Sequence, residues 1–155
     1  MAAQMSGHER ERRRRVRKEF REALRAVAGL APTHVQIGTA WHFSIDWGEP
    51  NQTGAAVPPA SSHRLLVSGS WRLDAQDRVI CSWRNPGSRA DSKLPSLVGR
   101  PVVAIRVAPP GNDLTISFEG GRTLRIFCDR DSAYIFFTQG YAFGIDEKCD
   151  LEIAR

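Results

Sequence analysis

The apolar positions of the N-terminal segment repeat with the period of an α-helix. Four of them are spaced by four, four and three residues, which places them in one stripe along the helix. The stripe consists of Val16, Phe20, Leu24 and Val27. Ser6 and Glu9 have the spacing of a capping box at a helix start, and Gly29 suits the left-handed position after a helix end. We therefore expect a helix over about 8–28, with a first part that carries no apolar stripe and projects into solvent or meets a partner.

After Pro32 the apolar positions recur at every second residue, which is typical of half-buried strands. The first run extends from Val35 to Trp47, and we expect one long strand there or a break near Gly38. Shorter runs follow, separated by turn-rich segments. They cover 65–73, 79–83, 103–107, 114–118, 124–128, 134–137, 141–145 and 151–153.

Two turns in this pattern indicate antiparallel hairpins. Residues 74–77 read as a turn between two alternating runs, and Gly120-Gly121 suits the positive φ angles of a tight hairpin. No second helix offers the crossover that a parallel β-α-β unit needs. The predicted fold is mainly β (α+β): one basic helix, then about eight or nine antiparallel strands as a bent sheet, a sandwich or a partly open barrel. We divide the chain into an Arg-rich tail and helix, 1–30, and a single β domain, 31–155.

The charge of the chain is concentrated in the predicted helix. The 155 residues carry a net charge of +5. Of 22 basic and 17 acidic residues, nine and four lie between Glu9 and Arg25, which leaves 13 of each sign elsewhere. Any electrostatic attraction of a partner is therefore predicted to arise from this segment.

The candidate macromolecule-binding residues are the cations of the first helical turns. They are Arg10, Arg12, Arg13, Arg14, Arg15, Arg17 and Lys18. They could contact nucleic acid phosphates, an acidic lipid surface or an acidic protein. Alternatively, they form a solvated face with the ion pairs Glu11–Arg15 and Lys18–Glu22. Because 12–15 are four consecutive cations, they spread around the helix, which weakens a recognition-helix interpretation.

The chain offers few groups for catalysis. His42, Ser44 and Asp46 share one face of a predicted strand, but successive residues on a face are roughly 6–7 Å apart, and a wet sheet face explains them better. His63 could activate a thiol only if the fold brought a cysteine to it. The three cysteines are Cys81, Cys128 and Cys149, of which the last is expected to be the most exposed. We predict no catalytic residue, no metal site and no cofactor.

Compartment and source follow from composition. The odd cysteine count without a C-x-x-C pair indicates reduced thiols. No apolar run is long enough for a membrane span and no secretory signal is seen, so we expect a cytoplasmic protein. Arginine outnumbers lysine 19 to 3, which suggests a bacterial, GC-rich genome.

Four tryptophans are the strongest candidates for lining a ligand site. Trp41, Trp47, Trp71 and Trp83 all fall in phase on predicted strands. Core packing is the expected role of such residues. If the sheet closed as an open-mouthed barrel, they would instead line an apolar pocket for a small ligand.

The stretch from Leu97 to Asp129 has a characteristic cadence. It contains LVGRPV, then DLTISF, then GRTLRI. This cadence resembles small bacterial β-rich proteins, some of which accompany polymorphic toxins as immunity proteins. The resemblance covers about a fifth of the chain, carries over no functional residue and makes an enzyme slightly less expected.

Three functions are compatible with these features. The first is a non-enzymatic, immunity-like interaction protein that engages an acidic macromolecular partner, with a protein partner or a homo-oligomer preferred. The second is a nucleic-acid-binding protein that uses the Arg-rich helix. The third is a small-molecule binder or enzyme with a site in a barrel interior.

Overall fold

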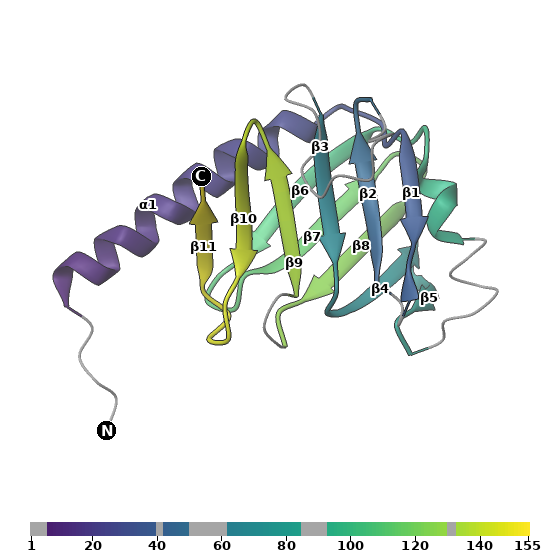
Figure 1. The fold of residues 1–155 in the computed structure, drawn as a ribbon. Coiled ribbons are helices and arrows are strands. Elements are labelled where there is room, and N and C mark those ends of the chain that lie inside the picture. The colour runs from purple at the N-terminus through teal and green to yellow at the C-terminus, as the bar shows by residue number, and fades with distance from the viewer. Residues whose placement is uncertain (1–5, 40–41, 50–61, 85–92, 130–132) are drawn as a thin grey trace.

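The computed structural model describes residues 6–39, 42–49, 62–84, 93–129 and 133–155. In this part of the chain, one α-helix lies beside two layers of antiparallel strands (Figure 1). The helices are α1 (Gly7–Leu24) and the 3-10 turns η1 (Arg25–Val27) and η3 (Leu94–Leu97). The first strands are β1 (His34–Ile37), β2 (Phe43–Trp47), β3 (His63–Val67), β4 (Ser70–Ala75) and β5 (Arg78–Ser82). The later strands are β6 (Val102–Ala108), β7 (Asp113–Phe118), β8 (Arg122–Phe127), β9 (Tyr134–Thr138), β10 (Tyr141–Ile145) and β11 (Leu151–Ala154).

The strands form two sheets that face each other. The six-stranded sheet has the order β1-β2-β3-β9-β10-β11, and the five-stranded sheet has the order β5-β4-β8-β7-β6. All pairings are antiparallel, and the described strands close no barrel. This confirms the predicted mainly β class with one N-terminal helix, and the architecture is that of a sandwich.

The run from Val35 to Trp47 is two strands, with the break near Gly38 that was one of the two predicted alternatives. The backbone N–H of Gly38 donates to the carbonyl of His42 at 2.7 Å, and the chain reverses there. Val35 then stands opposite Ile45 in the β1–β2 pair. Both arms keep their odd-numbered residues on the same face, which is why alternation alone did not reveal the reversal. The described residues thus contain eleven strands, more than the eight or nine predicted.

The predicted strand 65–73 also divides, because the chain changes sheets within it. β3 ends at Val67 in one sheet and β4 begins at Ser70 in the other. Between them the N–H groups of Ser68 and Gly69 both donate to the carbonyl of Ala133, at 3.0 and 2.9 Å. A Cβ atom on Gly69 would lie 2.9 Å from the Cβ of Ala133, so the crossing needs a glycine.

The local signals at the turns and helix ends are confirmed. The Ser6 side chain accepts a hydrogen bond from the N–H of Glu9 and caps α1. Gly29 has φ = +82° after the helical turns, and Gly120 and Gly121 have φ = +83° and +75° in the β7–β8 hairpin. A residue with a Cβ atom would be sterically strained at these positive φ angles, whereas glycine adopts them without strain.

The apolar stripe of α1 closes one open side of the sandwich. The helix contacts β11, at the edge of one sheet, and β6, at the edge of the other. Phe20 is fully buried, and its ring centroid lies 5.2 Å from that of Phe143 and 6.0 Å from that of Tyr134. The second half of the helix is therefore part of the core, while its first turns extend beyond the strands (Figure 1).

A basic ridge on the N-terminal helix as the candidate functional site

Ion pairs within the chain engage only some of the helical arginines. Glu9 binds Arg12 at 3.5 Å and Arg13 at 3.2 Å, and Arg13 also reaches Asp150 at 2.8 Å. The hydrogen bonds from Arg13 and then Arg12 lower the pKa of Glu9 below its usual value. The Arg13–Asp150 pair ties α1 to the segment before β11, so Arg13 has a structural role.

A second set of ion pairs lies around Glu19. Its carboxylate is 3.9 Å from Arg15 and 3.4 Å from Arg155. The predicted pairs Glu11–Arg15 and Lys18–Glu22 do not form among the described residues. Arg15 instead pairs with Glu19, which is four residues further along the helix. Glu19 also pairs with Arg155, the residue after β11.

The remaining cations share one face of the helix, which we call the basic ridge. It consists of Arg10, Arg14, Arg17, Lys18, Arg21 and Arg25. Spacings of three and four residues place these side chains within about 100° of one another on a helix of 3.6 residues per turn. The ridge is roughly 22 Å long at a rise of 1.5 Å per residue. No glutamate of α1 falls within it.

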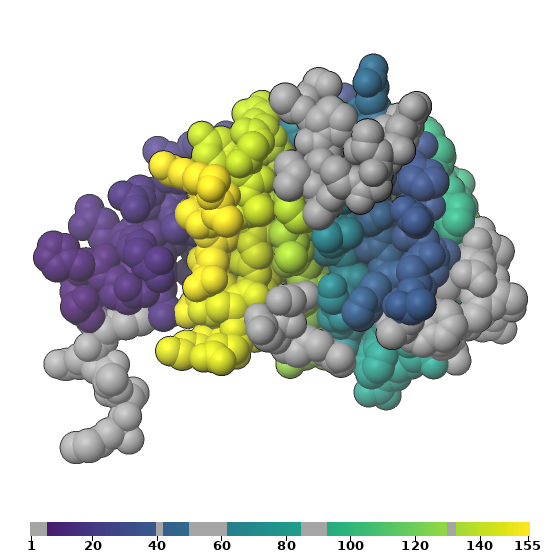
Figure 2. Space-filling model, viewed as in Figure 1, coloured from purple at the N-terminus to yellow at the C-terminus, as the bar shows by residue number. Residues whose placement is uncertain are grey.

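The ridge cations are largely free to bind something else. Within the described residues, Arg10, Arg14, Lys18 and Arg21 form no ion pair. Arg17 donates to the carbonyl of Pro110 at 3.3 Å, which directs the ridge toward the turn between β6 and β7. In Figure 2 the first turns of α1 stand away from the body of the molecule. Like charges three and four residues apart destabilise a helix by roughly 0.2–0.5 kcal/mol a pair, a cost that an anionic partner would remove.

The structure thus refines the predicted set of binding residues. Arg12, Arg13 and Arg15 are engaged by carboxylates of this chain, whereas Arg10, Arg14, Arg17 and Lys18 lie on the ridge. The consecutive run 12–15 does spread around the helix, as expected. Sequence reasoning missed Arg21 and Arg25, although the three- and four-residue spacing of cations from 10 to 25 carried the signal.

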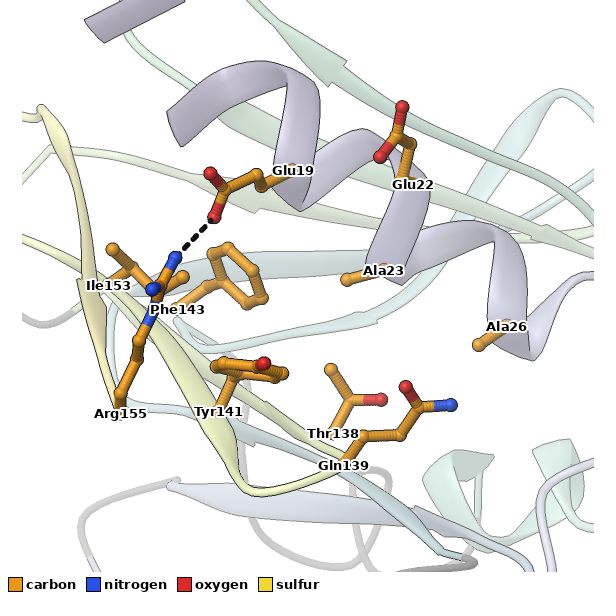
Figure 3. A pocket seen from close by; sticks show the side chains of 10 residues that line it. All are labelled: Glu19, Glu22, Ala23, Ala26, Thr138, Gln139, Tyr141, Phe143, Ile153 and Arg155. Atoms are coloured by element: carbon orange, nitrogen blue, oxygen red, sulfur yellow. Dashed lines mark hydrogen bonds and ion pairs between the residues drawn. The ribbon is translucent and has the colours of Figure 1, made fainter. Parts of the chain in front are cut away.

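A groove between α1 and the six-stranded sheet is a second candidate site. Its volume is about 400 Å³, and across it Glu19 of the helix reaches Arg155, which follows β11, while Tyr141 lies on the sheet side (Figure 3). Phe143 and Ile153 supply apolar lining. The Arg155 guanidinium lies 5.7 Å from the centroid of the Tyr141 ring. The lining offers no cysteine, histidine or metal-ligand cluster, so the groove can hold a small ligand but has no evident nucleophile–base pair.

His63 is a buried histidine beside this groove. Its Nδ1 atom is 2.7 Å from the hydroxyl of Thr138, and its ring stacks on Phe136 with centroids 6.2 Å apart. Burial lowers the pKa of His63, because the charged imidazolium would lose its hydration. Burial thus favours the neutral ring, and its hydrogen bond is to a hydroxyl, not to a thiol.

This burial predicts a pH dependence of stability. The pKa of His63 is lower in the folded chain than the unfolded value of about 6.5. The unfolded chain therefore binds more protons below that pH, and the stabilisation present above about pH 6.5 is lost as the pH falls toward the folded pKa. The urea midpoint of the wild type should drop more between about pH 7.5 and pH 5.5 than that of His63→Gln. Equal changes in both proteins would show that His63 is not responsible.

The cysteines are placed as structural groups. Cys81 is buried, and desolvation raises the pKa of its thiol to about 11. The pKa of Cys128 rises to about 12, mainly through desolvation and also through the charge of Asp113. Cys149 is half-buried, and its thiol donates to the carbonyl of Cys128 at 2.8 Å. High thiol pKa values make the first two poor nucleophiles at neutral pH.

The face with His42, Ser44 and Asp46 is not the wet surface that alternation suggests. Ser44 and Asp46 are buried, whereas His42 is exposed. The carboxylate of Asp46 lies 2.6 Å from Nε of Arg64 on the neighbouring strand β3. Alternation along one strand cannot predict this ion pair with a neighbouring strand. The carboxylate of Asp46 binds Arg64 and not a histidine.

The described tryptophans belong to the core. Trp47 and Trp71 are buried, and Trp83 is partly buried against the same cluster. Trp41 lies outside the described residues. None of the described three lines the groove of Figure 3, and core packing is the role that their phase on the strands favours.

No three His, Cys, Asp or Glu side chains in the described ranges are grouped so that they could hold a metal ion. The helices described also include none with the length and hydrophobicity needed to cross a membrane. Comparison of the chain with protein-family models, with curated proteins and with solved structures found no match.

Proposed function

We propose that this protein is a non-enzymatic binding protein that engages an acidic macromolecule through the basic ridge. The segregation of cations on α1 carries the proposal. The arginines on one side of the helix are neutralised by carboxylates of the same chain, and those of the ridge are not. The ridge therefore offers cations to an anionic partner that no carboxylate of the described chain neutralises.

The docking of α1 supports this role. Phe20 and the rest of the apolar stripe are buried between the two sheets, so the ridge has a defined orientation on the molecule. A preoriented set of guanidinium groups binds an anionic partner with less loss of conformational entropy than a flexible basic tail. The resemblance to immunity proteins makes an acidic toxin one such partner, and this remains a prediction.

The proposal is tested by removing charge from the ridge. The variant Arg10→Ser/Arg14→Ser/Lys18→Ser should bind a labelled polyanion roughly 10- to 100-fold more weakly than the wild type, because three anion contacts are lost. The probes are a single-stranded oligonucleotide of roughly 16 nucleotides and a polyglutamate of equal charge, each titrated at low and moderate salt.

A matched control removes the same charge from cations outside the ridge. Arg12, Arg15 and Arg155 have exposed side chains and bind carboxylates of this chain. Their triple replacement by serine should change the affinity less than about threefold, since it leaves the ridge intact. Equal losses in the two variants would mean that net charge, and not the ridge, attracts polyanions. If the wild type bound neither the oligonucleotide nor polyglutamate, the proposal itself would be contradicted.

A further inference from the structure

The outer face of the five-stranded sheet carries a row of arginines at directly opposed positions. In the β4–β8 pair Arg72 stands opposite Arg125, and in the β7–β8 pair Thr115 stands opposite Arg125. In the β6–β7 pair Arg106 stands opposite Thr115. Residues opposed in this way point to the same face of a sheet, so the four side chains form one line across four strands, roughly 14 Å long.

This arginine row is held in place yet remains exposed. Nε of Arg72 and Nε of Arg125 each lie 3.0 Å from a different oxygen of Asp74, and the two arginine side chains are 41% and 42% exposed. The Arg72 guanidinium also lies 5.9 Å from the centroid of the Phe127 ring. One carboxylate shared by two guanidinium groups leaves a net positive charge, and the Nε–H of Arg125 donates a hydrogen bond to it.

A line of hydroxyl groups runs beside the arginine row. Thr123 stands opposite Asp74, and Ser117 stands opposite Thr123, on the same outer face. Both residues are half-buried, as is Thr115 within the row itself. Hydroxyl donors next to guanidinium groups match the oxygens of a phosphate, which accept several hydrogen bonds at once.

Arg106 joins the row to the basic ridge. A groove of about 330 Å³ separates α1 from β6, and its lining includes Arg21 and Arg25 of the ridge together with Arg106. The ridge and the row are therefore adjacent across this groove. Together they make a basic path roughly 35 Å long, from the first turns of α1 to β4.

We propose that this path binds a nucleic acid strand, whose phosphodiester backbone runs from the ridge across Arg106 onto the arginine row. The inference rests on the proposed function and names the partner class. A regular series of anionic phosphates fits a line of cations better than a folded acidic protein does, since the latter presents its carboxylates on a surface of fixed shape. Guanidinium groups, neighbouring hydroxyls and aromatic rings are groups with which proteins bind single strands.

The test removes charge from the row alone. Arg106→Ser and Arg106→Ser/Arg125→Ser should weaken binding of the single-stranded oligonucleotide about threefold and about tenfold. Each lost phosphate contact should reduce the slope of log K against log salt by about 0.7. Arg78→Ser is the control, because Arg78 is exposed on β5 of the same sheet but lies at the β4–β5 turn, off the path. Thermal unfolding checks that every variant is folded.

The outcomes separate this inference from the proposed function. Loss of affinity in the ridge variant but not in the row variants would overturn the continuous path and leave the ridge as the binding surface. Polyglutamate binding as tightly as the oligonucleotide would overturn nucleic acid as the partner class. A duplex of the same sequence could bind with equal affinity and lose as much affinity in Arg106→Ser. That result would overturn a single strand as the preferred ligand and would support the basic path as the binding surface. Weaker and salt-sensitive binding of the oligonucleotide in both sets of variants supports the inference.

Discussion

Replacing Phe20 with alanine is expected to lower the free energy of unfolding by about 3 to 5 kcal/mol. The side chain is fully buried, and its ring lies against Tyr134, Phe136 and Phe143 of the six-stranded sheet, with centroids 5.2 to 6.4 Å apart. Alanine removes these contacts and leaves a cavity that two sheets cannot close, because their spacing is set by the other core residues. Urea unfolding followed by tryptophan fluorescence measures the change.

The matching control on the same helix is Lys18→Ala. Lys18 is exposed and forms no ion pair with the described residues, so its replacement should change stability by less than about 0.5 kcal/mol. A loss below about 1 kcal/mol for Phe20→Ala would contradict the docking of α1 between the sheets. It would also remove the fixed orientation on which the basic ridge depends.

Replacing Arg64 with methionine is expected to cost about 3 to 5 kcal/mol. The Asp46 carboxylate is 3% exposed, and both of its oxygens face the Arg64 guanidinium, at 2.6 and 3.2 Å. Methionine keeps the volume of the arginine stem but removes the guanidinium. The buried carboxylate of Asp46 then has no positive charge from residue 64 beside it. The loss is measured as a change in the urea midpoint at neutral pH.

Two comparisons isolate the buried ion pair. The double variant Arg64→Met/Asp46→Leu removes both charges and should regain most of the lost stability, because two apolar side chains of similar volume pack where the pair was. Removing the exposed partner of Arg15, by Glu19→Ala, should cost less than about 1 kcal/mol. A double variant no more stable than Arg64→Met would show that the loss arises from packing rather than from an uncompensated charge.

The turns and the helix could be predicted from the sequence because their causes are local. A stripe at Phe20 and its neighbours, a cap at Ser6 and glycines with positive φ at 29, 120 and 121 each depend on residues close in the chain. The break at Gly38 was one of two predicted alternatives and the change of sheet at Gly69 was not predicted, because the apolar phase continues through both. The change of sheet depends on backbone groups that are distant in the chain, such as the Ala133 carbonyl, which accepts a hydrogen bond from the N–H of Gly69.

The candidate site shows the same division. The cluster of cations between residues 10 and 25 can be predicted from the sequence, because charge is a property of each residue. The ion pairs of Arg12 and Arg15 are made within the helix, whereas Arg13 also binds Asp150, more than a hundred residues away. The opposition of Arg72, Arg125 and Arg106 depends on the register of four strands.

Helix, strands, turns and the location of the excess charge thus follow from residue order, because hydrophobic periodicity, glycine geometry and side-chain charge act over a few residues. The pairing of strands into two sheets, the burial of Asp46 with Arg64 and the line of cations from α1 to β4 arise when distant segments come together. Long-range contacts are chosen by the packing of the whole core, and no local pattern encodes their partners.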